Sequence, residues 1–352
     1  MVEKILPYKI PPVYAYLHHA YTLGVLLCYA DTEQWFSGNY IQLMCNTDFS
    51  KELWFDFFVG DNYGGLPWFN YHIFDKSILN ISENGLHEFV QYSINQGYYL
   101  HLYLDEYYLP CRPFYHSTHF THCNLIYGYD CENENYHVAG FNNKMNFALS
   151  TISFTQFAGS FGAENTDLNN VRAYKNFLFK KKKITRYDFE MSKTIDILND
   201  YLLSRNCSEK PGLYYDLDSD LRFTYLNIAA HLKDQVFGLG VYDCLINYLD
   251  SRMSREIDIR AFHCLWEHKK CMLLRIMYLG SRGYLKDYYP VYNEYEEITN
   301  IALHVRNLAL KYSITENVNT IKRVINMLKE IHERELSLIP NLLEELRKYT
   351  LD

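Results

Sequence analysis

The spacing of apolar residues changes near the middle of the chain, and this change is the strongest constraint on the fold. In the first half, apolar residues form short runs bounded by glycine, asparagine and other turn formers, as in Leu53–Val59 and Asn124–Tyr129. Such runs predict short β-strands. In the second half, apolar residues recur every three or four positions, as in 298–309 and 321–331. This spacing predicts amphipathic helices.

The chain has 352 residues, a length that suits two domains. We therefore predict an α+β protein with an N-terminal domain at 1–162 and an all-α domain at 163–352. The N-terminal domain should also contain two helices, near His19–Ala30 and Glu83–Asn95. Pro340 should kink or end the last long helix, because proline cannot donate a backbone hydrogen bond.

Composition excludes several classes of function. The formal net charge of -8 argues against nucleic acid as the main partner. The nine cysteines are odd in number and form no CxxC pair, as expected for reduced thiols rather than a disulfide framework. No apolar run approaches the roughly 18 residues of a membrane span, and three prolines near the N-terminus argue against a signal peptide. We expect a cytoplasmic protein without a membrane partner.

The densest polar cluster lies between Asp105 and Asp130 (DEYYLPCRPFYHSTHFTHCNLIYGYD). A strand-like run follows His122 directly, and an acidic turn separates it from a second run, Tyr136–Phe141. This pattern predicts a β-hairpin with a histidine at its entrance, and Asp130 should cap the turn. Thiol-dependent acyl transfer needs this kind of histidine, with a third group to orient the imidazole and a cysteine at a helix N-terminus. The helix that begins near His19 is the natural place for the nucleophile.

The segments HCNLIYGYD (122–130), DEYYLP (105–110) and YHVAGF (136–141) resemble the butirosin biosynthesis protein H N-terminal-domain family. The helical stretch Gly238–Leu279 is similar to the C-terminal half of proteins from peptide-synthetase clusters. The resemblance implies a papain-like fold related to bacteriocin-processing cysteine peptidases. The founding member moves an acyl group from a carrier-protein thioester onto an amine. A relative in closthioamide assembly looks like a cysteine protease but forms amides.

The resemblance also assigns roles to individual residues. His122 matches the catalytic histidine. The family's nucleophile usually follows a histidine as His-Cys at the start of the first helix, where this chain has His19-Ala20. The family's aspartate falls in a window that here holds Val138 and Gly140, and Asn142 close by could orient the imidazole instead.

Three explanations of Ala20 stay open. Alanine was introduced deliberately, or the protein is a natural non-catalytic relative, or the register differs and another thiol, Cys28 or Cys45, is used. An oxyanion hole near the nucleophile needs amide or backbone donors, and Gln42 and Asn39 are candidates. Asp105 could orient a histidine or bind a substrate amine, although a structural role at a strand end is the simpler interpretation.

Two further patterns have mainly structural interpretations. His116, His119, His122 and Cys123 could bind zinc, but a spacing of three alternates faces in a strand, and loop histidines are the better prediction. Cys123 should be a buried core thiol.

The segment 258–279 contains several charged residues and a histidine. We expect a solvated helix face there, with a carrier-protein dock as the alternative. These residues are Arg260, Glu267, His268, Lys269 and Lys270. The run 180–183 should be a solvated surface, with a dock for an acidic partner as the alternative.

These observations predict a papain-like acyltransferase that forms an amide from a carrier-protein thioester in specialised-metabolite biosynthesis of the nonribosomal peptide type. The expected partners are an acyl or peptidyl carrier protein and a small-molecule amine. The reaction needs no metal and no resident cofactor, because phosphopantetheine arrives on the carrier. A non-catalytic scaffold of the same family, or a cysteine peptidase or thioesterase, is the alternative. The sequence leaves the oligomeric state open, a homodimer included.

Overall fold

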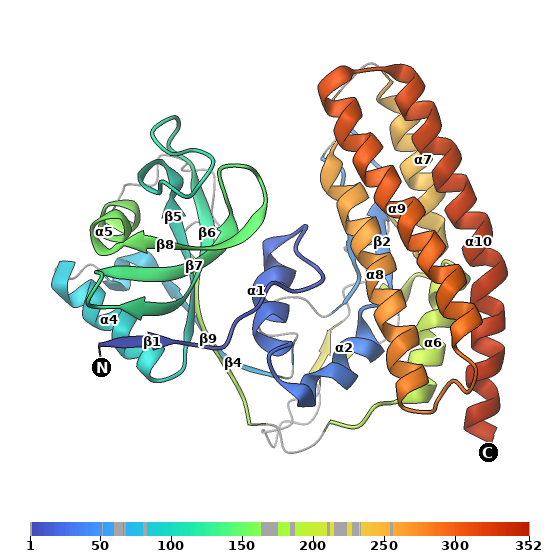
Figure 1. Ribbon diagram of the computed structural model, residues 1–352, viewed down its shortest axis with the longest axis horizontal. Helices are drawn as coiled ribbons and strands as arrows, with labels where there is room; N and C mark the ends of the chain where they lie inside the picture. Colours follow the sequence, from blue (N-terminus) through green and yellow to red (C-terminus); the bar gives the residue numbers. More distant parts are fainter. Residues whose placement is uncertain are drawn as a thin grey trace. The chain divides into compact units, whose positions relative to one another are not determined.

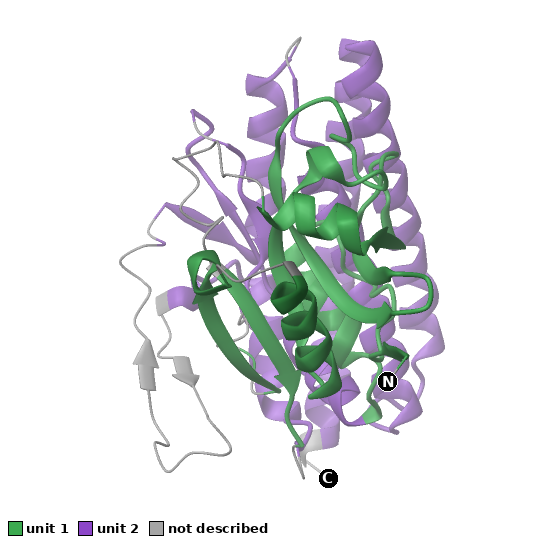
Figure 2. Ribbon diagram, turned by 90° about the vertical axis from the view of Figure 1, so that its left-hand side faces the viewer, with its two compact units in different colours: residues 1–30, 61–184 green, residues 31–60, 185–352 purple. Residues whose placement is uncertain are grey.

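The chain forms two compact units, which are described separately (Figure 2). The first contains residues 1–30 and 61–184, and the second contains residues 31–60 and 185–352. The computed structural model describes residues 2–50, 52–59, 66, 68–79, 83–162, 175–183, 187–209, 212–214, 224–226, 232, 234–253 and 256–351.

A seven-stranded antiparallel sheet forms the centre of the first unit (Figure 1). Its strand order is β4-β9-β5-β6-β7-β8, and β1 also pairs with β6. The strands are β1 (Glu3–Ile5), β4 (Phe69–Asp75), β5 (Tyr99–Asp105), β6 (Thr121–Asp130), β7 (Asn135–Phe141), β8 (Phe147–Ser153) and β9 (Lys175–Lys181). The helices are α1 (Leu17–Leu26), α4 (Glu83–Asn95) and α5 (Phe154–Gly162), with short 3-10 turns at η2 (Lys76–Leu79) and η3 (Glu106–Tyr108).

Helices cover both faces of this sheet. On one face, Tyr136 of β7 packs against Phe157 of α5, with ring centroids 4.9 Å apart. On the other face, Tyr21 of α1 packs edge-on against His101 of β5, at 5.2 Å. The β5–β6–β7 register and the alternation of side chains along a strand place Tyr136 and His101 on opposite faces. Apolar residues of the strands are therefore buried on both sides, which explains their nearly continuous apolar runs.

The expected hairpin is confirmed. Strands β6 and β7 pair from Asp130↔Asn135 onward, and Asp130 Oδ1 accepts hydrogen bonds from the backbone N–H groups of Glu132 and Asn133. These bonds cap the turn, as an aspartate at this position does. Helix α4 has the bounds that the spacing of its apolar residues predicts.

The second unit combines a helical bundle with small sheets. Its strands form a three-stranded antiparallel sheet of order β12-β2-β3 and a two-stranded ribbon, β10-β11. These strands are β2 (Leu43–Asn46), β3 (Phe55–Phe57), β10 (Gly212–Tyr214), β11 (Thr224–Leu226) and β12 (Gln235–Phe237). The longer helices are α2 (Glu33–Asn39), α6 (Met191–Leu202), α7 (Val241–Ser251), α8 (Ile259–Ser281), α9 (Tyr289–Thr315) and α10 (Val318–Leu351), and the short turns are η1 (Ala30–Thr32), η5 (Cys207–Glu209) and η7 (Gly238–Gly240).

One expectation for the helical part needs correction. The part is not all-α, because β12 pairs with β2 and so brings strands into it. Pro340 lies inside helix α10, so of the two expected effects, a kink or an end, the helix end is excluded. The periodic runs 298–309 and 321–331 do lie in helices α9 and α10, and their apolar residues are buried. Among the described helices, none combines the length and the apolar character needed to cross a membrane.

The units divide the chain differently from the expected 1–162 and 163–352. Strand β9 follows the expected boundary, yet it pairs with β4 and β5 and belongs to the first unit. Segment 31–60 precedes the boundary, yet it belongs to the second unit, because β2 pairs with β12. Long-range strand pairing therefore sets the division, and the local composition does not reveal it.

Gly238 offers a test of the packing in the second unit. Its φ is +57°, and a Cβ at this position would lie 2.1 Å from the backbone oxygen of Tyr201. We expect Gly238→Ala to lower the free energy of unfolding by about 2–3 kcal/mol, because backbone strain and a backbone clash add together. Gly283 is a matched control, since its φ is +76° but no described residue other than its two chain neighbours lies within 4 Å of an added Cβ there. Gly283→Ala should cost about 1 kcal/mol. Equal losses in urea unfolding of the two variants would contradict the clash.

Candidate functional site

A histidine held by a buried carboxylate lies at the start of β6. His122 Nδ1 lies 3.1 Å from Glu106 Oε1, and Glu106 is only 2% exposed. The β5–β6 register pairs His122 with Leu104, so the end of β5 brings η3 and its glutamate beside the histidine. In the tautomer that donates from Nδ1 to this carboxylate, Nε2 is the atom that can accept a proton.

The ring atom of His122 that does not face Glu106, Nε2, is placed to react with a substrate. The His122 side chain is 36% exposed, and for the part of the chain that the structure describes, no hydrogen bond engages Nε2. Within the same described part, Glu106 Oε2 is buried and also makes no hydrogen bond. A buried carboxylate oxygen without a donor is costly and is found at functional sites. The arrangement suits a general base that a carboxylate orients from behind.

A second histidine–carboxylate pair lies next to the first. His119 Nδ1 lies 2.7 Å from Asp105 Oδ2, and Asp105 Oδ1 accepts hydrogen bonds from the N–H groups of Tyr107 and Phe120. Asp105 therefore orients a histidine, but the histidine is His119 and not His122. It also fixes the strand end, as the simpler interpretation of Asp105 expects, and the binding of a substrate amine stays a prediction.

Arg112 braces the strands beside His122. Its Nε donates to Asn124 Oδ1 at 2.6 Å, and the Asn124 amide donates to the backbone oxygen of His122 at 3.2 Å. Arg112 is 1% exposed, and a Cβ at Gly140 would lie 2.9 Å from its Nη2. Glycine at 140 therefore leaves room for the guanidinium, which ties the start of β6 to β7.

Helix α1 approaches the same strand through Tyr21. Its hydroxyl donates to the backbone oxygen of Cys123 at 2.9 Å, one residue beyond His122. Ala20, the residue before Tyr21, is fully buried, and its backbone oxygen accepts a hydrogen bond from Tyr8. The position of the expected cysteine thus lies on a helix that is hydrogen-bonded to the strand of the expected base.

The buried His101 lies close to both elements. Burial lowers its pKa to about 3, and the nearby His122 and His18 add to this shift. His101 is therefore neutral across the physiological range. From β5 it packs against Tyr21 of α1 as an uncharged core residue, and His122 is the more exposed of the two histidines.

The other site candidates of the first unit make local hydrogen bonds. Asn142 Oδ1 accepts the N–H groups of Lys144 and Asn146, so its side chain closes the β7–β8 turn. Cys28 follows α1, and its thiol donates to the backbone oxygen of Gly24. Burial raises the pKa of Cys28, and it raises that of Cys123 to about 12. These shifts oppose formation of a nucleophilic thiolate.

Gln42 and Asn39 belong to the second unit and have partners there. The Gln42 amide donates to Cys207 Sγ at 2.9 Å, and its oxygen accepts the N–H of Leu43. The Asn39 amide donates to the backbone oxygen of Trp35 at 2.7 Å. Both side chains are therefore held by the local packing around α2 and β2.

The zinc alternative gains no support from the contacts of its candidates. His119 pairs with Asp105, and His122 pairs with Glu106. His116 lies in the connecting loop with a φ of +50°. Within the described residues, the four candidates do not form a set whose ligand atoms could share one ion.

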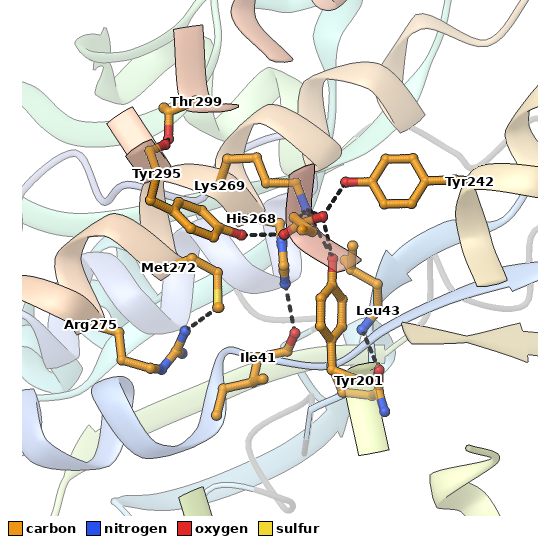
Figure 3. A network of polar contacts seen from close by, with 12 residues as sticks. Ile41, Leu43, Tyr201, Tyr242, His268, Lys269, Met272, Arg275, Tyr295 and Thr299 are labelled. Atoms are coloured by element: carbon orange, nitrogen blue, oxygen red, sulfur yellow. Dashed lines mark hydrogen bonds and ion pairs between the residues drawn. The ribbon is translucent and has the colours of Figure 1, made fainter. Parts of the chain in front are cut away.

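Helix α8 of the second unit contains a buried ionic network, part of which Figure 3 shows. Lys269 Nζ lies 2.9 and 2.8 Å from the two carboxylate oxygens of Glu335 and 2.9 Å from the hydroxyl of Tyr201. Tyr242 and Tyr295 also donate to Glu335. All five side chains are buried, and Lys269 and Glu335 have no exposed surface.

The expected solvated face of this helix is therefore wrong for three of its residues. Glu267, His268 and Lys269 each have an exposure of 0%. His268 Nε2 donates to the backbone oxygen of Ile41 at 2.6 Å, and burial lowers the pKa of His268 well below its usual value. A carrier protein cannot dock on groups without exposed surface. Arg260 is exposed, but it pairs with Asp258.

Glu106 is a candidate site residue whose pairing with His122 the sequence interpretation missed. It lies 16 residues before His122, whereas the resemblance directed attention to residues that follow the histidine. The available signal was the adjacent pair Asp105-Glu106 at the end of a strand-like run. Comparison of the chain with models of known families gives no match, and comparison with curated proteins gives no significant match.

Proposed function

We propose that this chain is a papain-like acyltransferase of specialised-metabolite biosynthesis, which moves an acyl or peptidyl group from a carrier-protein thioester to an amine. The observation that carries the proposal is the pair formed by His122 and the buried Glu106, 3.1 Å apart. The resemblance of the 122–130 segment to the butirosin biosynthesis protein H N-terminal-domain family supports the choice of reaction. Phosphopantetheine on the carrier would present the acyl group.

The step follows from the basic Nε2 atom of His122. Nε2 accepts a proton from the amine as the amine nitrogen bonds to the thioester carbonyl carbon. The C–S bond then breaks, and the imidazolium returns the proton to the departing thiolate. Glu106 stabilises the imidazolium and fixes the ring. With alanine at position 20, the amine attacks the thioester directly, without an acyl-enzyme intermediate.

A non-catalytic binding protein on the same scaffold is the second candidate. Ala20 favours it, because a thiol at this position would be the family's nucleophile. The raised pKa values of Cys28 and Cys123 favour it too, because neither thiol replaces the missing group. In this case the pair of His122 and Glu106 would be a remnant of the ancestral site.

A restored thiol tests the site and separates the two candidates. The probe is acetyl-pantetheine, a thioester with the chemical linkage of an acylated carrier, and hydroxylamine serves as the amine. We expect the native chain to release pantetheine thiol in the presence of hydroxylamine. We expect Ala20→Cys to gain one acetyl group by intact mass, and the gain should be lost in Ala20→Cys with His122→Gln.

Each result has a distinct meaning. Turnover by the native chain supports direct transfer. An acetylated Ala20→Cys variant without native turnover would assign the natural chain to the non-catalytic class. Neither turnover nor acetylation, in variants whose circular dichroism matches the native chain, would overturn the proposed site.

A further inference from the structure

Two thiols from distant parts of the chain meet inside the second unit. Cys45 lies in β2 and Cys244 in α7, and their Sγ atoms are 3.0 Å apart across a separation of 199 residues. Both cysteines are buried, at 0% and 5% exposure. Their sulfur atoms also approach the same backbone oxygen, that of Asn46, at 3.5 Å from Cys45 and 3.1 Å from Cys244. The acyl-transfer proposal does not involve these residues.

The surroundings make the two thiols unequal. Cys244 is the fourth residue of α7, which begins at Val241, so it lies in the first turn, where the helix dipole favours negative charge. The hydrogen bond between the two thiols lowers the pKa of Cys244, whereas the same bond and burial raise the pKa of Cys45. Its position in the first turn of α7 favours Cys244 over Cys45 as the attacking thiol.

Other buried thiols of the second unit lack this arrangement. Cys264 and Cys271 lie on α8, seven residues apart, and both are buried. Burial raises the pKa of both, to about 12 for Cys271. Two turns of helix separate these two residues, so they cannot pair with one another without breaking the helix. They provide matched controls for a buried thiol without a partner at bonding distance.

We propose that Cys45 and Cys244 form a redox-sensitive dithiol that a peroxide oxidises to a disulfide. The Cys244 thiolate attacks one oxygen of hydrogen peroxide, the O–O bond breaks, and a sulfenic acid and one water form. The Cys45 sulfur then attacks the sulfenic sulfur, the S–S bond forms, and a second water leaves. Two thiols lose two electrons and two protons in total, and the peroxide gains them.

The disulfide would tie helix α7 to the β12-β2-β3 sheet. It would close a loop of 199 residues, which restricts the unfolded chain strongly. Oxidation should therefore raise the melting temperature of the second unit, and a reductant should reverse the change. Oxidant would thus stabilise the second unit by joining the two sulfur atoms, and a thiol reductant would remove this stabilisation.

The test uses the full native chain and hydrogen peroxide. After exposure, the chain is unfolded in denaturant that contains N-ethylmaleimide, which alkylates each free thiol. Intact mass then gives the number of alkylated thiols. We expect the nine thiols to fall by two in a single step, and peptide mapping should join the Cys45 peptide to the Cys244 peptide. Cys264 and Cys271 should react at least about tenfold more slowly.

Variants assign the roles. Cys45→Ser should abolish the cross-link and leave Cys244 with added oxygen, whereas Cys271→Ser should leave the cross-link unchanged. The proposal is overturned if the first disulfide joins another pair, or if all nine thiols persist after treatment that oxidises free glutathione. Because mapping of the native chain carries the decision, a variant that fails to fold does not obscure it.

Discussion

Replacement of Lys269 by methionine is expected to lower the free energy of unfolding by about 3–5 kcal/mol. Lys269 and Glu335 are both fully buried, and the ammonium lies within 2.9 Å of both carboxylate oxygens. Methionine keeps most of the volume of the lysine but leaves the carboxylate without its counter-charge. The hydroxyl groups of Tyr201, Tyr242 and Tyr295 remain as donors, but they do not neutralise the charge. Urea unfolding followed by far-UV circular dichroism measures the loss.

Two controls isolate the buried charge. Glu335→Gln in the Lys269→Met background removes the remaining charge, so the double variant should be more stable than Lys269→Met alone. Lys348 pairs with Glu345 on the surface of α10 and is 58% exposed, so Lys348→Met should change stability by less than about 1 kcal/mol. The interpretation fails if the Lys269 and Lys348 variants lose equal stability.

Replacement of His122 by glutamine is expected to lower amine-dependent thioester turnover by about 10²–10⁴-fold, the usual contribution of a general base. Glutamine keeps a polar side chain of similar size near Glu106 but cannot accept the proton from the amine. The rate constant kcat should carry the loss and KM should change little, because the proton is transferred in the transition state. Steady-state release of pantetheine thiol measures both constants.

His119→Gln is the matched control for this prediction. His119 is also exposed, at 47% for its side chain, and it also bonds a buried carboxylate through Nδ1. Its loss should change turnover by less than about threefold, since the proposed step does not use it. Glu106→Gln should reduce kcat more than it raises KM, as expected for a residue that positions the base. Equal effects of the two histidine variants would assign His122 a structural role.

Local pattern was sufficient for some elements and insufficient for their partners, and it missed helices α2 and α5. The apolar spacing predicts α4 with its bounds, and Asp130 with the strands around it predicts the β6–β7 hairpin. Each of these depends on residues within a few positions of one another. The run Leu53–Val59 predicts a strand and contains β3, but the β12–β2 pairing joins residues that lie far apart in the chain, so the sheet of the second unit was missed.

The same reason explains what was missed in the sites. His122 was found because its strand follows it directly, but its partner Glu106 depends on the register between β5 and β6. Asn142 was chosen from the resemblance, and its side chain caps a turn. A run of charged residues on a helix is typical of a solvated face. Lys269 departs from that pattern because its partner Glu335 lies 66 residues farther along the chain.

The division of the chain between the two units has a consequence during synthesis on the ribosome. Segment 31–60 is made early but belongs to a unit whose remaining residues, 185–352, are made last. At translation rates of roughly 5–20 residues per second, the 199 residues from Asn46 to Cys244 take about 10–40 s to appear. During this interval β2 leaves the ribosome before β12 exists to pair with it. The first unit can acquire its complete sheet once β9 has emerged. For a time the nascent chain therefore holds β2 paired with β3 but lacking its second partner β12, while the first unit is already complete.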